Sequence, residues 1–565
     1  MTPPRFTARR QAITIRLFLC AVAFAANVFA CWVIPYRLRY DPGNSYYTFA
    51  YIGDEYTYSQ RLQPLIAGTT RSNPVNGICD PKVVSQFYLE DTLRELITLT
   101  GLDVVTCIWI WRIIFPPLLA ILFLQLARCC LPESRKPYAK LLTLAAGTAG
   151  MAIFFALYEV CLGNRVPHGW INRVPTNLEY PLSILLACFF VRFVQAPTER
   201  NAFVLSATGA LLVYMRPYVA APWGLALALS ISWMTLRRML SFRTAAVILG
   251  TLFVTLLPWV LIARHNAKIH TYQEMVARYL LVGWPYEVHK RWAVHVAIAA
   301  ALLLAGFLTE RRYRLMLWPA AGVMAILPFI LGLAGNLSHE LLLDDRYSPF
   351  YLVMLLIAAF LVLRQQMESW RGRDRLGASQ KTISALLAAC AILAIWHAGV
   401  NLKYDFRSYE PAQFAQVAED TQCVPAYKWI RENTPKDALF IVDDGHDWTM
   451  ISPDNTGLLL DHVYRFCDWN DLFQVVSQRR RVYGIRLYGL AIAEPDYLNV
   501  VMLHLGTFGF PIAKEAYVEA FKKYQPTHIF WRRTAPVPRG YGKTLEKLRE
   551  VIYSDGTCEV WKLKY

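Results

Sequence analysis

The chain has 565 residues, of which 55% are apolar and 18% are charged, and its mean hydropathy is +0.29. Soluble domains contain roughly 45–50% apolar and about 25% charged residues. This composition therefore excludes an ordinary soluble enzyme, a disordered protein and a disulfide-rich scaffold. The apolar residues form long blocks, which predicts a polytopic α-helical membrane protein.

The net charge of +17 is unevenly distributed along the chain. Residues 402–565 contain 21 basic and 21 acidic side chains, so the whole excess lies in residues 1–401. A basic protein could bind nucleic acid, but no soluble part of this sequence combines a basic patch with aromatic residues. We therefore expect no nucleic-acid partner.

The sequence predicts eleven bilayer spans, which usually take about 17–25 residues, although several of the eleven are shorter or contain Pro. The pair that is split by Arg216-Pro217 is the least clearly separated. The predicted spans are 13–35, 104–127, 140–161, 178–195, 201–215, 218–236, 244–263, 293–309, 315–334, 350–364 and 382–400.

Basic residues in the connecting loops predict which side each loop faces, because cytoplasmic loops are enriched in Lys and Arg. Arg237-Arg238, Arg311-Arg312 and the cluster at 371–375 are all cytoplasmic if the N-terminus is cytoplasmic. We then expect an uncleaved first span and an extracytoplasmic tail. This sidedness fits a bacterial inner membrane with a periplasmic tail, and an endoplasmic-reticulum membrane with a lumenal tail gives the same pattern.

Two domains follow from this topology: a membrane module at 1–401 and a C-terminal extracytoplasmic α/β domain at 402–565. The membrane module includes a large first outer loop at 36–103, in which residues 83–97 have the spacing of an amphipathic helix. That helix would lie on the bilayer surface or pack under the outer domain. In the tail, we expect helices at 426–433 and 514–524 and strands at 438–442, 527–531 and 557–563.

The 12 cysteines do not form a disulfide framework. Cys423, Cys467 and Cys558 share the outer domain, so one disulfide could form there in an oxidising compartment. No Cys/His spacing resembles a zinc site.

An acidic pair in the first outer loop is the first candidate for chemistry. Asp54-Glu55 is followed by Tyr58 and Arg61. A carboxylate aimed at a hydroxyl can act as a general base, and aromatic and guanidinium groups suit a sugar. The alternative is a solvated acidic pair on the surface.

Arg346 is the second candidate, at the mouth of the tenth span and beside Asp345. Arg binds phosphate through planar, bidentate contacts, and an ionisable group at membrane depth is a functional candidate. The alternative is an interfacial Arg that pairs with Asp345 or reaches lipid headgroups. Arg112 and Arg216, near other outer span ends, have the same two interpretations.

Together these segments resemble the integral-membrane glycosyltransferases of the C superfamily (GT-C). Members include protein O-mannosyltransferases, the lipid A aminoarabinose transferase and mycobacterial arabinosyltransferases. The resemblance covers the layout of nearly the whole chain. It depends on the cytoplasmic start, Asp54-Glu55 in a large first outer loop, DDRYSPFYLV at 344–353 and WIRENTPKDALFIV at 429–442.

The resemblance implies that a sugar moves, with inversion, from a polyprenyl-phosphate donor to a glycan, lipid or protein acceptor outside the cytoplasm. It implies Asp54 as the general base, with Glu55 supporting it or binding the acceptor. Arg346 would hold the lipid phosphate. The remaining candidates for this pocket are Arg61 and Arg278 for the phosphate and Tyr58, Asp345 and Tyr347 for the substrate.

One departure narrows the chemistry that the resemblance implies. Oligosaccharyltransferases of the superfamily carry a WWDYG-type motif and need a divalent metal, whereas this chain has only Asp447-Trp448 and Trp469-Asn470-Asp471. Transfer of a single sugar is therefore favoured, and no motif indicates a metal.

A polytopic transporter or flippase of lipid-linked glycans is the main alternative function. Transporters often contain two similar halves and charged residues near the midplane. This sequence has no clear internal similarity, and its charged residues cluster at the outer ends of the spans. A sensor with an outer ligand-binding domain would not need eleven spans. An O-antigen-ligase-like enzyme typically has its large loop late in the chain, whereas here the large loop comes first.

Overall fold

The structure is a computed structural model with two compact units. The first contains most of the helices up to residue 408, and the second contains the C-terminal helices and strands. The described residues are 98–102, 104–131, 178–215, 217–268, 288–333, 348–370, 422–442, 472–482, 514–533 and 549–564, with single positions at 143–154 and 503–507.

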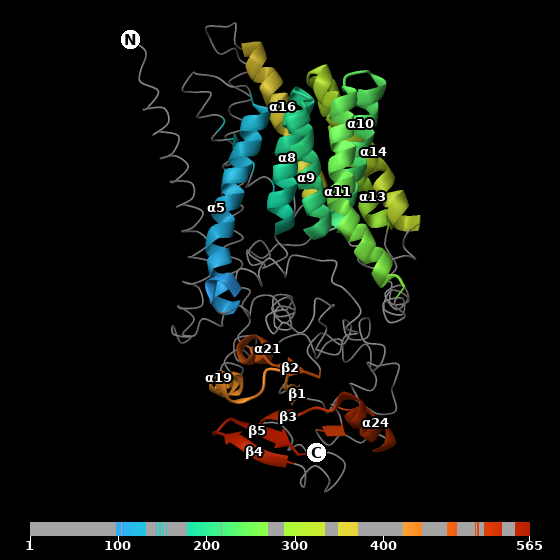
Figure 1. Ribbon diagram of the computed structural model, residues 1–565. Helices are drawn as coiled ribbons and strands as arrows, with labels where there is room; N and C mark the ends of the chain where they lie inside the picture. Colours follow the sequence, from blue (N-terminus) through green and yellow to red (C-terminus); the bar gives the residue numbers. More distant parts are fainter. Residues whose placement is uncertain are drawn as a thin grey trace, which may run out of the picture. The chain divides into compact units, whose positions relative to one another are not determined.

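The first unit is built from long apolar helices, shown from blue to yellow in Figure 1. Each of its long described helices coincides with a predicted span to within a few residues. They are α5 (Val104–Cys130), α8 (Glu179–Gln195), α9 (Glu199–Met215), α10 (Pro217–Leu236), α11 (Phe242–Asn266), α13 (Val288–Leu308), α14 (Arg311–Leu333) and α16 (Ser348–Trp370).

Three of these helices, α10, α11 and α16, are long and apolar enough to cross a membrane by length and composition. The described parts of α5 and α13 contain shorter apolar stretches, Leu118–Cys130 and Ala293–Leu308. The predicted spans 13–35 and 382–400 lie outside the described residues, as does the amphipathic stretch at 83–97. The full count of eleven spans therefore stays a prediction, and so does the domain boundary at 401–402.

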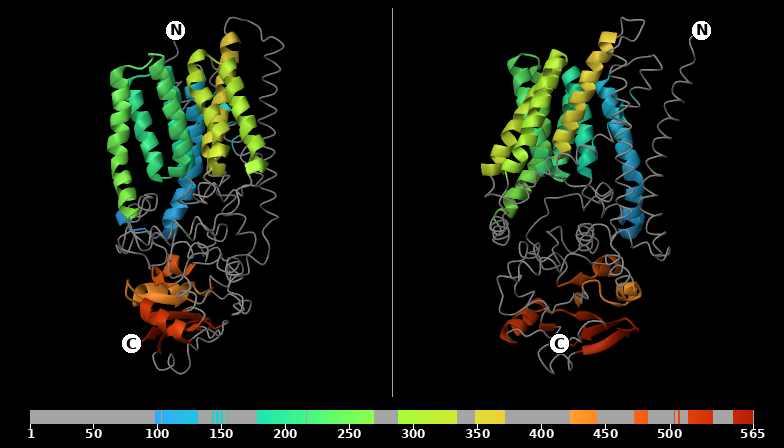
Figure 2. Two further views of the ribbon diagram at one scale, coloured as in Figure 1. Left: turned by 90° about the vertical axis from the view of Figure 1, so that its right-hand side faces the viewer. Right: turned by 180° about the vertical axis from the view of Figure 1, so that it is seen from behind.

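Short connections make neighbouring helices antiparallel (Figures 1 and 2). Three residues separate α8 from α9, one separates α9 from α10, and two separate α13 from α14. The core of the first unit is centred on α16, because almost every side chain from Phe350 to Leu361 is buried. In contrast, α11 exposes Leu249, Phe253 and Val254. An exposed face made of large apolar side chains suits lipid and not water.

The α13 and α14 helices approach each other closely at Gly306. A Cβ atom there would lie 2.3 Å from Nε1 of Trp318. The Trp318 indole is itself held between Phe307 and Trp233, with ring centroids 5.1 and 5.7 Å away. The indole therefore has little room to move aside.

We expect Gly306→Ala to destabilise the protein by about 1–3 kcal/mol, the usual cost of overpacking. Thermal unfolding of the detergent-solubilised protein, followed by size-exclusion chromatography, measures the effect. Gly322→Ala in α14 is the matched control, because a Cβ there meets no atom within 4 Å. Equal melting temperatures for the two variants would contradict this account of the α13–α14 contact.

The second unit is an α/β domain with a five-stranded mixed sheet in the order β2-β1-β3-β5-β4. The β1 strand is parallel to β2 and β3, whereas β5 is antiparallel to β3 and β4. Its elements are α19 (Val424–Asn433), β1 (Leu439–Val442), α21 (Leu472–Ser477), β2 (Arg480–Arg481), α24 (Lys514–Tyr524), β3 (His528–Arg532), β4 (Arg549–Ser554) and β5 (Cys558–Leu563).

The predicted tail helices and strands are present, with ends that differ by a residue or two. The sequence analysis did not predict α21, β2 and β4. The core beneath the sheet is aromatic: the Tyr427 ring lies 5.5 Å from Phe473 and 5.1 Å from Phe530. Arg479 holds the end of α19 in place by donating from Nη2 to the Thr434 carbonyl (2.7 Å) and from Nε to its hydroxyl (3.0 Å).

His528 on β3 is a buried histidine inside this domain. Its ring stacks on Phe440 at 4.7 Å, and its Nδ1 lies 2.8 Å from the Thr527 hydroxyl. Burial is the main reason that the pKa of His528 is lowered to about 4, and the charges of Lys562 and Arg479 lower it further. The imidazole is therefore neutral in the folded protein at neutral pH.

This lowered pKa predicts acid sensitivity of the second unit. Below about pH 6.5 the unfolded chain binds a proton at His528 that the folded chain excludes, so stability falls as the pH drops toward 4, by roughly 3 kcal/mol at most. Hydrogen–deuterium exchange of β3 in the full-length protein, measured from pH 7 to pH 4, checks this. His528→Gln should flatten the pH dependence, and an unchanged slope in that variant would contradict the assignment.

Candidate functional site

Three helices of the first unit begin close together. The Phe350 ring of α16 packs edge-on against Trp223 of α10, with centroids 5.0 Å apart. The Tyr351 ring faces His295 of α13, with centroids 6.3 Å apart. These residues lie within or just beyond the first two turns of their helices. The chain therefore enters α10, α13 and α16 at one end of the unit, which we call the entry end.

The opposite end, which we call the ionic end, contains a group of charged side chains. Glu310, between α13 and α14, pairs with Arg312 at 2.6 Å and with Arg364 of α16 at 3.3 Å. Arg364 also pairs with Glu368 at 3.0 Å. These contacts join the last turns of α16 to the α13–α14 connection.

Uncharged groups connect two more helices to the ionic end. Gln195, the last residue of α8, donates from Nε2 to the Tyr313 hydroxyl (3.0 Å) and to the Cys129 carbonyl of α5 (2.8 Å). Since α5 ends at the ionic end, it begins toward the entry end. The basic loops that are predicted to be cytoplasmic adjoin helix ends at the ionic end. For example, Arg311-Arg312 begins α14.

The directions of the helices also indicate the end of the unit at which each preceding segment joins its helix. The segments 36–103, 269–287 and 334–347 lead directly into α5, α13 and α16, which all begin toward the entry end. These segments contain every sequence-predicted site residue: Asp54, Glu55, Tyr58, Arg61, Arg278, Asp345, Arg346 and Tyr347. All eight lie outside the described residues, so no contact among them is established. Arg346 precedes the first residue of α16, Ser348, by two positions.

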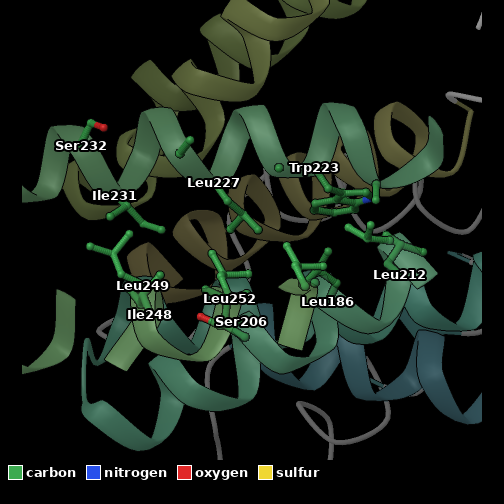
Figure 3. A pocket seen from close by; sticks show the side chains of 17 residues that line it. Leu186, Ser206, Leu212, Trp223, Leu227, Ile231, Ser232, Ile248, Leu249 and Leu252 are labelled. Carbon is green, nitrogen blue, oxygen red and sulfur yellow. The ribbon is translucent and has the colours of Figure 1, made fainter. Parts of the chain in front are cut away.

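An apolar cavity of about 340 Å³ lies between α8, α9, α10 and α11 (Figure 3). Ligand pockets usually have volumes of about 300–1,000 Å³. Among its lining residues, Leu249 is also exposed on the outer face of α11. The cavity is therefore flanked by a surface that faces hydrocarbon. The side chains that Figure 3 labels are Leu186, Ser206, Leu212, Trp223, Leu227, Ile231, Ser232, Ile248, Leu249 and Leu252.

The cavity reaches the entry end. Leu212 and Val213 from the end of α9 and Ala220 from the start of α10 line it there. Only Arg216 separates these two helices in sequence. Near this end, Nε1 of Trp223 is buried without a hydrogen-bond partner among the described residues. At the Ser206 position, the hydroxyl donates to the Ala202 carbonyl at 2.8 Å, so this serine adds little polarity to the cavity.

The sequence analysis did not predict the cavity, although a signal for it exists. Ala220, Gly224 and Ala228 recur every four residues along α10 and line the cavity, with Gly209 on α9. Small residues at this spacing usually allow helices to approach closely. Here a Cβ added at Gly224 would meet no atom within 4 Å. The same pattern therefore leaves a hollow, which only the positions of the neighbouring helices reveal.

Among the described residues, no group of three or more His, Cys, Asp or Glu side chains could hold a metal ion. The acidic pair Asp54-Glu55 lies outside the described residues.

No model of a known protein family matches the chain, and no functionally curated protein does. Among solved structures, the chain is similar to an Archaeoglobus fulgidus oligosaccharyltransferase tethered to an acceptor peptide. That match has 13% identity and a TM-score of 0.43, and covers 92% of this chain and 69% of the other. The chain is also similar to ArnT from Cupriavidus metallidurans bound to undecaprenyl phosphate, with 13% identity, a TM-score of 0.49 and coverage of 96% and 97%.

An identity of 13% with a TM-score below 0.5 does not transfer the activity of either protein to this chain.

Proposed function

We propose that the chain is a GT-C glycosyltransferase. It would transfer a single sugar from a polyprenyl-phosphate-linked donor to an acceptor outside the cytoplasm, with inversion at the sugar. The proposed location is the bacterial inner membrane, with a cytoplasmic N-terminus and a periplasmic C-terminal domain. Undecaprenyl phosphate is the proposed lipid carrier.

The observation that carries this proposal is the shared end of the helices. The three segments that contain Asp54-Glu55, Arg278 and Arg346 lead into helices that begin toward the entry end. The base acts on the acceptor hydroxyl and the cation binds the donor phosphate, and both must meet at one reaction centre, so they need to reach one side of the membrane. The helix directions satisfy that requirement.

Each residue has a defined role in the proposed reaction. Asp54 removes the proton from the acceptor hydroxyl, and the acceptor oxygen bonds to the anomeric carbon of the sugar. The bond between that carbon and the phosphate oxygen breaks, and the lipid phosphate leaves. Arg346 stabilises the charge that develops on this phosphate, a task suited to a preorganised cation in a site that excludes water. Glu55 orients Asp54 or the acceptor.

The apolar cavity suits the isoprenoid chain of such a donor. It is lined almost entirely by hydrocarbon and is flanked by the exposed apolar face of α11. Its end at Leu212 and Ala220 lies at the entry end. A tail bound in the cavity would leave the attached phosphate at the entry end of the first unit.

We expect Asp54→Asn to lower turnover by about 10²–10⁴-fold, the usual contribution of a general base. Lipids that co-purify with the full-length protein in gentle detergent can be identified by mass spectrometry. The variant should retain the sugar-charged polyprenyl phosphate, because donor binding persists while transfer stops. The wild type should retain more of the bare polyprenyl phosphate.

Glu55→Gln is the matched control for this experiment, because it alters the neighbouring carboxylate and keeps the proposed base. It should allow partial turnover and so accumulate less charged donor than Asp54→Asn. If wild type and both variants carry the same lipids, Asp54 is not the base. Sugar-charged lipid that the wild type moves across the bilayer unchanged would identify a flippase instead.

The cavity assignment makes a separate prediction. Gly224→Leu should extend a side chain into the cavity, because Gly224 lines it and no atom lies within 4 Å of a Cβ at this position. We expect about tenfold less co-purified polyprenyl lipid, because each buried methylene that is displaced costs about 0.8 kcal/mol. The same mass spectrometry provides the measurement.

Gly250→Leu in α11 is the control, because Gly250 is exposed, does not line the cavity and also has no atom within 4 Å of its Cβ. This variant should bind as much polyprenyl lipid as the wild type. Equal lipid content in the Gly224 variant and the control would assign the isoprenoid chain to another site.

A further inference from the structure

Two cysteines that are 135 residues apart in sequence meet inside the C-terminal unit. Cys423 immediately precedes α19, and Cys558 is the first residue of β5. Their sulfur atoms lie 2.9 Å apart. Both side chains are almost fully buried, with exposed fractions of 2% and 0%.

The separation is short for two thiols that only pack together. A disulfide bond measures about 2.05 Å between sulfur atoms, so the pair is within about 1 Å of bonding distance. For comparison, the sulfur of Cys129 lies 3.9 Å from its hydrogen-bond donor on Gln125. Among the described residues, no cluster around the pair could hold a metal ion, which makes a thiolate metal site a poor explanation.

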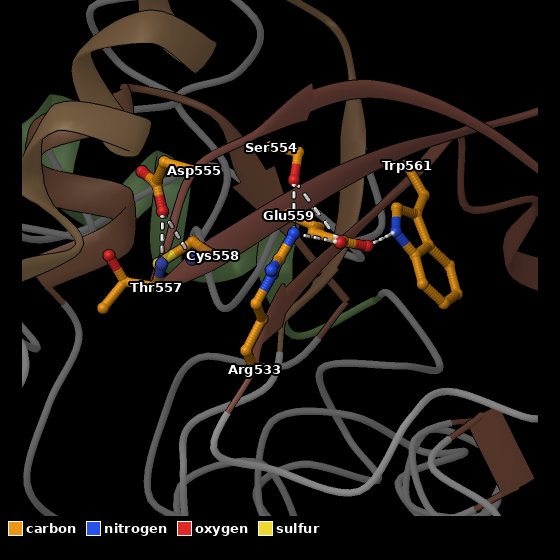
Figure 4. A network of polar contacts seen from close by, with 7 residues as sticks. All are labelled: Arg533, Ser554, Asp555, Thr557, Cys558, Glu559 and Trp561. Atoms are coloured by element: carbon orange, nitrogen blue, oxygen red, sulfur yellow. Dashed lines mark hydrogen bonds and ion pairs between the residues drawn. The ribbon is translucent and has the colours of Figure 1, made fainter.

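The local backbone holds both sulfur atoms in place. Cys423 occupies the N-cap position of α19, yet its side chain caps no helix N–H and points to Cys558 instead. On the other side, Oδ1 of Asp555 accepts hydrogen bonds from the backbone N–H groups of Thr557 and Cys558, both at 2.7 Å. Figure 4 shows these bonds beside the contact of Arg533 with Glu559 (2.9 Å). The start of β5 is therefore fixed beside α19.

We infer that Cys423 and Cys558 form a disulfide bond that joins α19 to β5 in the mature protein. The inference depends on the extracytoplasmic location that we propose for this domain, because disulfides persist in oxidising compartments. The oxidant is a thiol–disulfide carrier protein in its disulfide form. One cysteine thiolate attacks that disulfide, the second cysteine displaces the carrier, and the carrier leaves as a dithiol with both electrons.

Burial of both sulfur atoms slows thiol–disulfide exchange in the folded domain. Cys423, burial and the charge of Asp555 all raise the pKa of the Cys558 thiol in the folded, reduced domain. Since only a thiolate attacks a disulfide, exchange is slow once the pair is buried. The same burial then protects the finished bond from reduction. Closing a loop of this length restricts the unfolded chain and so stabilises the domain.

Differential alkylation of the full-length protein tests the inference. Membranes are quenched in acid, denatured and treated with N-ethylmaleimide, then reduced and treated with isotopically heavy N-ethylmaleimide. We expect heavy label at Cys423 and Cys558, and a peptide pair linked through these two residues before reduction. Light label on both cysteines, or a link from either one to Cys467, would overturn the inference.

Matched variants separate the bond from general effects on folding. Cys467→Ser should keep the linked peptide pair and the wild-type melting temperature. Cys423→Ser should leave Cys558 with light label and lower the melting temperature of the unit by about 5–10 °C. If both cysteines are reduced in the wild type and Cys423→Ser does not change the melting temperature, the two cysteines do not form the bond. Such a result leaves the transferase proposal standing if the polyprenyl donor still co-purifies.

Discussion

The short connections between successive helices are the constraint on which the first unit depends. In hydrocarbon, each helix must satisfy its own backbone hydrogen bonds, so the chain can reverse direction only at helix ends. One residue between α9 and α10 and two between α13 and α14 leave no alternative to antiparallel neighbours. The helix ends therefore fall into two sets. Ion pairs around Glu310 and Arg364 hold one set together, and aromatic contacts at Phe350 and Tyr351 hold the other.

This division separates stability from chemistry. At the ionic end, charged side chains pair with one another, and their partners are all within the unit. At the entry end, α5, α13 and α16 begin, and the segments that contain the proposed base and phosphate-binding cation precede these helices in the sequence. Between the ends, the apolar cavity runs along α10 and reaches the entry end at Leu212 and Ala220. A lipid-linked sugar has the same polarity: a long apolar tail with a charged phosphate and a sugar at one end.

The C-terminal unit depends on separate interactions of its own. Strand β5 lies between β3 and β4, so any opening of β5 removes two strand pairings at once. The Asp555 turn fixes its first residues, and Arg479 fixes the end of α19. A bond between Cys423 and Cys558 would join these two elements covalently.

Local patterns in the sequence were sufficient to predict most of the described elements of both units. Apolar blocks located α8 to α16, and Pro435 marked the end of α19. Apolar runs located β1 and β3. The same method missed β4, whose alternate residues are only partly buried, and β2, whose two arginines form a strand only because they pair with β1. These strands depend on neighbours that are distant in sequence, and a local pattern contains no information about those neighbours.

For the candidate site as well, some features follow from the sequence and others only from the tertiary structure. The sequence alone determined the residue types that suit sugar transfer and the order of their segments, since these are properties of the chain itself. Its charge and hydropathy also predict the side that each loop faces. Only the tertiary structure decided which helix ends meet, because that depends on packing between segments over 100 residues apart. It also turned the small residues around Gly224 into a cavity, and it selected Cys558 as the partner of Cys423 among the cysteines of the tail. Each of these features depends on the distances between atoms that only folding brings together.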